Sequence, residues 1–197
     1  MRRWLLAGIA LLLAACASDD RPPVVVLTTD AGVIEIEMVV TAAPLTAANF
    51  LRLAGEGHFD GAAFYRVVRP DNDNGDPVIS IVQGGRQNAP QVFPPIPHES
   101  TAQTGLRHVD GAVSMARLFP GTASSEFFVC IGDQPALDHG GTRNADGEGF
   151  AVFARVVVGM HVVRAIHATP DEALVGDGYL AGQVLSQPVR INSVRVK

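Results

Sequence analysis

Serine and histidine, the residues that most often do covalent chemistry, are present, but their spacing matches none of the common active sites. Ser114 lies in VSM and Ser124 in ASSEF, so neither has the flanking glycines of the G-x-S-x-G turn that exposes a nucleophile. The six histidines never fall at H-E-x-x-H spacing, and no segment reads G-x-x-x-x-G-K-[ST]. A hydrolase, a metal site and a phosphate-binding loop are therefore unsupported, and an activity based on binding and electrostatics is favoured.

The acidic segment 71–76, Asp-Asn-Asp-Asn-Gly-Asp, has a superficial similarity to a calcium-binding loop. Its glycine stands at the fifth position, where an EF-hand loop needs it at the sixth, and no Glu follows at the twelfth. Asp, Asn and Gly are also the residues typical of turns. We therefore expect a solvated turn here, and no metal or other cofactor in the protein.

Composition and charge limit the class of protein. The chain has 197 residues, 47% of them hydrophobic, and a formal net charge of −5, which fits one folded domain with an apolar core. Only 15 residues are Lys or Arg, so nucleic acid is not expected as a partner. The two cysteines, Cys16 and Cys130, are too few for a disulfide framework or a tetrahedral zinc site. We expect a monomer.

Residues 1–20 have the pattern of a secretory signal peptide. Two arginines precede an apolar run from Trp4 to Ala15, whose 12 residues are fewer than the roughly 20 that span a bilayer as a helix. The segment Leu13-Ala14-Ala15-Cys16 resembles a bacterial lipobox, in which the cysteine receives lipid and becomes the first mature residue. The open alternatives are a permanent transmembrane anchor and an ordinary secretory peptide with an incidental cysteine.

The lipobox interpretation divides the chain into a signal peptide 1–15, a lipidated tether 16–23 and a folded domain 24–197. Buried acyl chains contribute about 0.8 kcal/mol per methylene, so two or three of them hold a protein firmly on a membrane. Alanine, not aspartate, follows Cys16, which resembles the sorting signal for the outer membrane of Gram-negative bacteria. We therefore expect a cell-envelope protein that is lipid-anchored through Cys16 and faces the periplasm.

From Val24 onward the hydrophobic pattern predicts a mainly β domain. Apolar and acidic residues alternate over 33–40, as in a half-buried strand, whereas Thr41–Gly55 and Met160–His167 have helical spacing. Eight strand candidates and two helices indicate an antiparallel barrel or sandwich with helices covering its ends. The other seven strand candidates are 24–29, 63–68, 78–84, 112–117, 127–131, 151–158 and 189–196. Three long loops, at 70–77, 87–108 and 137–149, are candidate positions for function.

Short motifs follow one another in a fixed order along this domain. They are FYRVV at 64–68, VQGG at 82–85, VSMA at 113–116, SEFFV at 125–129, LDHG at 137–140 and FAVF at 150–153. In order and spacing they resemble the cyclophilin-type peptidyl-prolyl cis-trans isomerases, over essentially all of residues 24–197. The resemblance implies an eight-stranded antiparallel closed barrel capped by two helices, which agrees with the strand count above.

The activity that the resemblance implies is rotation about an X-Pro peptide bond. Amide resonance opposes this rotation with a barrier of roughly 18–20 kcal/mol, so the unaided reaction takes tens of seconds. No covalent bond forms or breaks, so the reaction needs neither a nucleophile nor a cofactor. An apolar pocket for the proline ring and a hydrogen-bond donor that favours the twisted amide are sufficient to accelerate it.

The same resemblance implies a set of site residues. Arg66 is the implied catalytic donor to the prolyl amide, and Gln83 is implied to orient it. Considered without the resemblance, Arg66 is also compatible with an outward strand position and Gln83 with a turn cap. The residues implied to bind substrate are Gln83, Ile81, Ala116, Arg117, Glu126, Phe128, Leu137 and Phe150, of which the apolar ones are also compatible with the ordinary core.

Several positions depart from the family pattern. Ser80 stands where a pocket Phe is common and Ala136 where some members carry Trp, so we expect a shallower pocket or one that Phe150 fills. Glu126 replaces a Gln that contacts substrate. Its carboxylate is expected to pair with Arg66 across the groove, which would either orient the guanidinium or occupy it.

Two functions stay open at this point. The first is a peptidyl-prolyl cis-trans isomerase that assists the folding of envelope proteins, with proline-containing, unfolded or flexible polypeptides as partners. The alternative is a chaperone or scaffold that binds proline segments with little turnover, which Glu126 and Ser80 favour.

Overall fold

The computed structural model describes residues 21–86, 93–170 and 173–197. The predicted signal peptide and Cys16, the predicted lipidation residue, lie outside the described residues, as do residues 17–20 of the predicted tether. Within the described ranges, no helix has the length and apolar character needed to cross a membrane.

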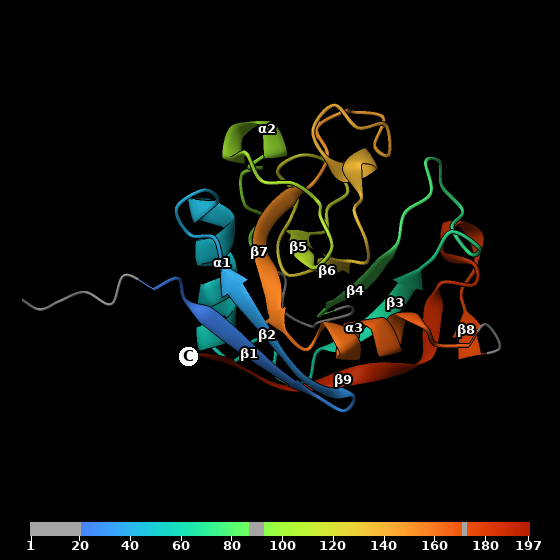
Figure 1. Cartoon of the computed structure of the whole chain (residues 1–197), viewed down its shortest axis with the longest axis horizontal. Helices are drawn as coiled ribbons and strands as arrows, with labels where there is room; N and C mark the ends of the chain where they lie inside the picture. Colours follow the sequence, from blue (N-terminus) through green and yellow to red (C-terminus); the bar gives the residue numbers. More distant parts are fainter. Residues whose placement is uncertain (1–20, 87–92, 171–172) are drawn as a thin grey trace, which may run out of the picture.

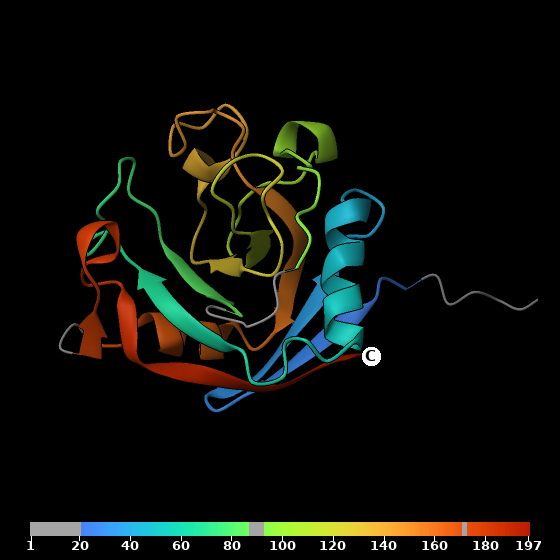
Figure 2. The same cartoon turned by 180° about the vertical axis from the view of Figure 1, so that it is seen from behind.

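Eight antiparallel strands close into a barrel (Figures 1 and 2). The hydrogen-bonded order is β1-β2-β7-β5-β6-β4-β3-β9, and β9 pairs with β1 to complete the ring, while the two-residue β8 (Leu174–Val175) adds to β9. This arrangement confirms the predicted fold class. The eight barrel strands are β1 Val24–Thr29, β2 Gly32–Met38, β3 Ala63–Val68, β4 Ile81–Gly85, β5 Ala112–Met115, β6 Phe127–Cys130, β7 Ala151–Val158 and β9 Val184–Val196.

Two longer helices, α1 (Pro44–Gly55) and α3 (Met160–His167), cover the barrel with their apolar faces. The Phe50 ring of α1 lies 5.4 Å from that of Phe127 and 5.0 Å from that of Phe153, so α1 seals the aromatic interior. Both helices were predicted, although α1 begins at Pro44 rather than at residue 41.

A short third helix, α2 (Thr101–Thr104), was not predicted. Its N-terminus has a signal in the sequence, because Ser100 is followed three residues later by Gln103. The Gln103 side chain accepts a hydrogen bond from the Ser100 N–H at 2.9 Å, and Gly105 ends the helix in the left-handed conformation. One turn is too short to show helical periodicity, which is why the pattern missed it.

Strand residues alternate between the barrel interior and a second apolar cluster. In β6, Phe127 and Val129 belong to the interior core, whereas Phe128 and Cys130 belong to the second cluster. The Cys130 side chain is fully buried, and burial raises the pKa of its thiol, as expected for a small apolar packing residue. The second cluster is the base on which the candidate site is built.

Two strands start more than one residue away from their predicted starts, and three others, β2, β5 and β6, end one or two residues earlier than predicted. Strand β4 begins at Ile81 rather than at 78, because the backbone N–H groups of Ile79 and Ser80 donate to the side chains of Asp73 and Gln134.

Strand β9 begins at Val184 rather than at 189. Pro188 lies inside it, and a proline lacks the N–H of a strand ladder, so the sequence pattern shows the strand only after this residue. The longer strand matters for the site, because it brings Val184 opposite Arg66.

Candidate active site

Four neighbouring strands bring the key side chains into one row. Arg66 of β3 pairs with Gln83 of β4, Gln83 pairs with Phe128 of β6, and Phe128 pairs with Ser114 of β5. The register between β3 and β4 shifts at Tyr65, and such a bulge re-aims the side chains beside it. Motifs far apart in the sequence thus meet on one face of the barrel.

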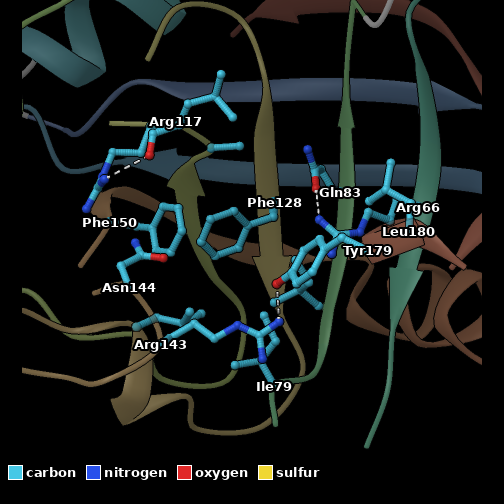
Figure 3. Close-up of a pocket in the computed structure, with 14 residues that line it drawn as sticks. Arg66, Ile79, Gln83, Arg117, Phe128, Arg143, Asn144, Phe150, Tyr179 and Leu180 are labelled. Atoms are coloured by element: carbon cyan, nitrogen blue, oxygen red, sulfur yellow. Dashed lines mark hydrogen bonds between the residues drawn. The ribbon is translucent and has the colours of Figure 1, made fainter. Parts of the chain in front are cut away.

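A pocket of about 510 Å³ lies over this row (Figure 3). Eight of the nine predicted site residues of the barrel domain line it, and the exception is Glu126. The eight are Arg66, Ile81, Gln83, Ala116, Arg117, Phe128, Leu137 and Phe150. Six further residues, which the sequence did not single out for the site, complete the lining: Ile79, Leu118, Arg143, Asn144, Tyr179 and Leu180.

Phe128 forms the apolar floor of the pocket and is rigidly held. Its ring is 2% exposed, meets the Phe150 ring edge-on at 5.3 Å, and stacks on the His108 ring at 6.0 Å. His108 is fixed in turn by Asp138 at 2.8 Å and by the Ser114 hydroxyl at 3.0 Å. Burial lowers the pKa of His108 although Asp138 opposes this shift, which favours a neutral ring beneath the floor.

The guanidinium of Arg66 stands at one side of this floor, held by neutral groups. Its Nη1 donates to Gln83 Oε1 at 3.0 Å, while Nε and Nη2 donate to Gln183 Oε1 at 2.9 and 2.6 Å. The Tyr179 ring lies over it, with 5.6 Å between Cζ and the ring centroid. Burial lowers the pKa of Arg66, but an arginine remains charged at neutral pH. Within the part of the chain that the structure describes, this positive charge has no acidic partner and lines an apolar pocket.

The predicted ion pair between Glu126 and Arg66 is wrong. Glu126 Oε2 instead accepts a hydrogen bond from the Tyr65 hydroxyl at 2.7 Å, and Tyr65 Oη accepts one from Gln83 Nε2 at 2.7 Å. Glu126 is thus linked to Arg66 through Tyr65 and Gln83. The Tyr65 side chain is long enough for its hydroxyl to bind the Glu126 carboxylate in place of Arg66. The sequence pattern alone did not reveal this contact.

Glu126 lies instead on a smaller adjoining pocket of about 240 Å³. Burial raises the pKa of its carboxyl, and burial together with Glu126 raises the pKa of the Tyr65 phenol. This second pocket shares Gln83, Ala116 and Arg117 with the main one, so a polypeptide that lies across both would meet Glu126 beside the proline site.

The Arg117 side chain is occupied by protein partners. Its Nη1 and Nη2 bind the Asp146 carboxylate at 2.8 and 2.9 Å, Nε donates to the Gly149 carbonyl at 2.9 Å, and Cζ lies 5.2 Å from the Phe150 ring centroid. The hydrogen bonds from Arg117 lower the pKa of Asp146 to about 2. Arg117 therefore holds the loop before β7 and the Phe150 wall in place.

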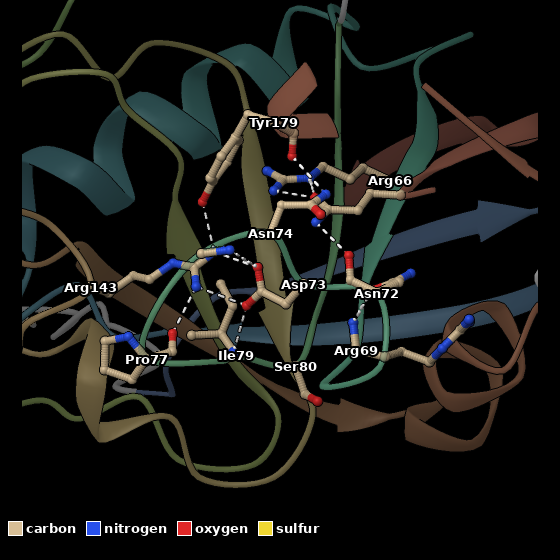
Figure 4. Close-up of polar contacts among 12 residues, drawn as sticks. Arg66, Arg69, Asn72, Asp73, Asn74, Pro77, Ile79, Ser80, Arg143 and Tyr179 are labelled. Carbon is tan, nitrogen blue, oxygen red and sulfur yellow. Dashed lines mark hydrogen bonds and ion pairs between the residues drawn. The ribbon is translucent and has the colours of Figure 1, made fainter. Parts of the chain in front are cut away.

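The acidic loop 70–77 forms the exposed turn that its composition predicts, except at the side chain of Asp73. The Asp73 carboxylate is fully shielded and binds Arg143 through two contacts of 2.8 Å (Figure 4). The backbone N–H groups of Gly75 and Ile79 also donate to it. Asp73 therefore joins two loops that are 70 residues apart in the chain. Within the described ranges, no three His, Cys, Asp or Glu residues gather as a metal site would require.

Breaking the buried Asp73–Arg143 pair is expected to destabilise the protein. Arg143→Met leaves the Asp73 carboxylate buried without its cation, so we expect the free energy of unfolding at pH 7 to fall by about 3 kcal/mol. Urea unfolding measures this change. Arg155→Met, which removes an exposed partner of Glu37, is the matched control and should change it by less than about 1 kcal/mol. Equal losses in the two variants would contradict the structural role of the pair.

The same pair has an expected pH dependence. Burial alone would raise the pKa of Asp73, but the hydrogen bonds from Arg143, Ile79 and Gly75 outweigh it and lower the pKa. Stability from a carboxylate with a lowered pKa is present above the unfolded-state value of about 3.9 and is lost as the pH falls through the folded-state value. The difference in the free energy of unfolding between wild type and Arg143→Met should therefore become smaller below pH ~4.

Sequence reasoning missed Tyr179, Gln183 and Arg143. Gln183 is fully buried and directly precedes β9, whose early start was hidden by Pro188. Tyr179 lies in a segment without periodic apolar residues, and Arg143 lies in a loop. Only their three-dimensional contacts reveal them. Neither Ser80 nor Ala136, where we expected missing rings to make the pocket shallower, lines the pocket, whereas Tyr179 does.

Comparison with protein-family models matches residues 24–196 to the family described as cyclophilin type peptidyl-prolyl cis-trans isomerase/CLD. The chain is 34% identical to peptidyl-prolyl cis-trans isomerase A of Dickeya dadantii over 207 residues, which cover 100% of this chain and 98% of that protein. It is also 34% identical to a peptidyl-prolyl cis-trans isomerase of Streptomyces antibioticus over 173 residues, 86% of this chain and 96% of that protein.

Solved structures share the fold. The crystal structure of a cyclophilin-type peptidyl-prolyl cis-trans isomerase from Cryptosporidium parvum superposes with a TM-score of 0.67 at 18% identity. The superposition covers 89% of this chain and 98% of that one. At this identity the likeness concerns the barrel and its helices.

Proposed function

This chain belongs to the cyclophilin-type peptidyl-prolyl cis-trans isomerase family, and from that premise we propose that it isomerises X-Pro bonds of envelope proteins and so assists their folding. One observation carries the proposal: the Arg66 guanidinium, which has no acidic partner among the described residues, lines an apolar pocket floored by Phe128. Such a pocket suits a neutral proline ring, and such a cation suits an amide whose nitrogen is losing its conjugation.

In the proposed mechanism, the proline ring packs on Phe128 between Ile81 and Leu137. Arg66 has five N–H groups, three of which donate to Gln83 and Gln183, so donors remain for the substrate amide. A hydrogen bond to the prolyl nitrogen is available only when that nitrogen has become pyramidal, so it stabilises the twisted amide more than either planar isomer. Each 1.36 kcal/mol of this difference is a factor of about ten in rate.

Gln83 and Gln183 are proposed to act on Arg66 rather than on the substrate bond. Both present amide oxygens to the guanidinium, which fixes its plane without neutralising its charge. A preorganised donor needs no reorganisation as the transition state forms. The backbone of Ala116 and Arg117, on the opposite side of the pocket, is proposed to align the substrate main chain.

The alternative function is a module that binds proline segments with little turnover. Its support is that Arg66 is engaged by two glutamines and covered on one face by Tyr179. A refolding experiment separates the two functions. With a client protein whose slow step is prolyl isomerisation, catalytic amounts of an isomerase shorten the slow phase, whereas a pure binder in the same amounts leaves its rate constant unchanged. The second result would reject the isomerase proposal.

The protein is also proposed to act as a monomer, anchored by lipid at Cys16 on the periplasmic side of the outer membrane. The support is the sequence of residues 1–20, with its short apolar run and its lipobox-like Leu13–Cys16 segment. Cys130, the other cysteine, is buried in β6 and serves as the matched control.

Replacing Cys16 by serine is expected to abolish lipid attachment. Cells fed radioactive palmitate should label the wild type and Cys130→Ser, but not Cys16→Ser, because the acyl chains require the thiol. Fractionation should then release Cys16→Ser from the outer membrane, since lipid chains rather than a helix hold the protein there. Label in Cys16→Ser equal to that of the wild type would contradict the anchor.

A further inference from the structure

The Arg66 guanidinium makes two kinds of contact: hydrogen bonds in the plane of the group and a contact with an aromatic ring that lies over one of its faces. Gln83 and Gln183 bind the guanidinium edges, and the Tyr179 ring centroid lies 5.6 Å from Cζ. A guanidinium within about 6 Å of a ring centroid is attracted to the ring face, and the attraction strengthens when water is excluded. Figure 3 shows Tyr179 and Arg66 together on one side of the pocket, with Phe128 beside them.

Tyr179 is 54% exposed, but its side chain is fixed by protein contacts. Its hydroxyl accepts a hydrogen bond from Arg143 Nη2 at 2.6 Å, and Arg143 Cζ lies 5.9 Å from the ring centroid. The charge of Arg143 is met by the shielded Asp73 carboxylate. Tyr179 is thus bracketed by two guanidiniums, one anchored by an ion pair and the other at the proline pocket.

The backbone that carries Tyr179 is fixed by the loop that supplies Asp73 (Figure 4). Asn74 Nδ2 donates to the carbonyls of Tyr179 and Ala181 at 3.2 and 2.9 Å. On the other side of Asp73, Asn72 Nδ2 donates to the Gly182 carbonyl, and the Asn72 carbonyl accepts from Gln183 Nε2, both at 2.9 Å. The three consecutive loop residues 72–74 therefore position both Tyr179 and Gln183, the two residues near the C-terminus that contact Arg66.

We propose that Tyr179 is a positioning residue for Arg66, held by the Asp73–Arg143 pair and by the loop around it. The inference rests on the proposed isomerase function and assigns a task to loop 70–77 and to residues 177–183. The ring restricts the guanidinium to the orientation in which its remaining N–H groups face the prolyl amide. Tyr179 thus acts through Arg66, and its contribution belongs to kcat more than to KM.

The test compares two substitutions of Tyr179 in the full-length protein. Tyr179→Leu removes the ring and should lower kcat for an X-Pro peptide by about fivefold, with a smaller change in KM. Tyr179→Phe keeps the ring, loses only the hydrogen bond from Arg143, and should retain most of the wild-type kcat. Phe119→Leu, at an aromatic residue that is 71% exposed and does not line the pocket, is the matched control and should behave as wild type.

A double substitution asks whether the effect passes through Arg66. In the Arg66→Ala background no guanidinium remains to be positioned, so adding Tyr179→Leu should leave the residual rate unchanged. A further fivefold loss in that background would overturn the proposal, as would wild-type kcat in Tyr179→Leu. A rise in KM alone would also overturn it, since Tyr179 would then be only a pocket wall.

The Arg66 Nε–H resonance supplies a readout that is independent of turnover. The ring current of Tyr179 should shift this resonance in the wild type and in Tyr179→Phe, and the shift should vanish in Tyr179→Leu. An inactive wild type that keeps this shift would reject the proposed isomerase function while the positioning of Arg66 stands. Identical Nε–H resonances in all three proteins would reject the positioning itself.

Discussion

Replacing Arg66 by alanine is expected to lower kcat/KM for isomerisation of an X-Pro peptide by about 100-fold. The substitution removes the donor that we propose for the twisted amide and leaves the apolar floor of Phe128, Ile81 and Leu137 in place. Binding of the proline ring should therefore persist while the chemical step slows. Protease-free exchange measurements over a range of peptide concentrations give kcat and KM separately, and the loss should lie in kcat.

Two controls make the Arg66 result interpretable. Arg155→Ala removes an exposed arginine from β7, outside the pocket lining, and should leave kcat/KM at the wild-type value. Arg66→Ala also leaves the amide oxygen of the buried Gln183 without the Arg66 donors, which by itself lowers stability by about 1–3 kcal/mol. Urea unfolding must therefore show that both variants are folded under assay conditions. Equal rates for Arg66→Ala and Arg155→Ala would remove Arg66 from the mechanism.

Replacing Phe128 by alanine is expected to have the largest effect on stability of the changes considered. The ring is 2% exposed and contacts both Phe150 and His108, so its loss leaves a cavity beneath the pocket. Truncating a buried phenylalanine in this way lowers the free energy of unfolding by about 3–5 kcal/mol. Thermal or urea unfolding measures the loss. Phe119→Ala removes a ring that is 71% exposed and should leave stability nearly unchanged.

A milder substitution at the same position tests binding if Phe128→Ala does not fold. Phe128→Leu retains apolar volume, but leucine presents a less flat surface to the proline than a phenyl ring does. We therefore expect a folded protein with a raised KM for X-Pro peptides. The reason is that the proline ring packs directly on this side chain in the proposed complex. An unchanged KM in folded Phe128→Leu would show that the proline binds elsewhere.

Three of the predicted site residues, Arg66, Gln83 and Phe128, lie in short motifs on regular strands. Leu137 lies in a 3-10 helix, and Ala116, Arg117 and Phe150 lie just beyond strand ends. The motifs Phe64–Val68, Val82–Gly85 and Ser125–Val129 overlap β3, β4 and β6, and the pairing of these strands brings Arg66, Gln83 and Phe128 into the same row. Because strand pairing is regular, a correct motif order also placed these residues next to one another. The strand pattern left a barrel or a sandwich open, and the closed barrel that the family resemblance implied is confirmed.

The parts that the sequence did not predict depend on loops. Asp73 meets Arg143 and Tyr179 meets Arg66 only because of hydrogen bonds between irregular segments, which no periodic pattern records. The expected pairing of Glu126 with Arg66 failed for a related reason. The prediction relied on the opposite charges of Glu126 and Arg66 alone, whereas in the structure the Tyr65 hydroxyl binds the Glu126 carboxylate in place of Arg66. Irregular backbone thus decides which of the available polar partners meet.

Exchange spectroscopy on a proline-containing peptide with the wild-type protein tests the central claim most directly. Free peptide interconverts between its cis and trans isomers over tens of seconds. With protein present at a small fraction of the peptide concentration, cis and trans resonances should show exchange cross-peaks on the sub-second timescale, and these should be lost in Arg66→Ala. Shifted peptide resonances without faster exchange would show that the pocket binds proline segments and does not isomerise them.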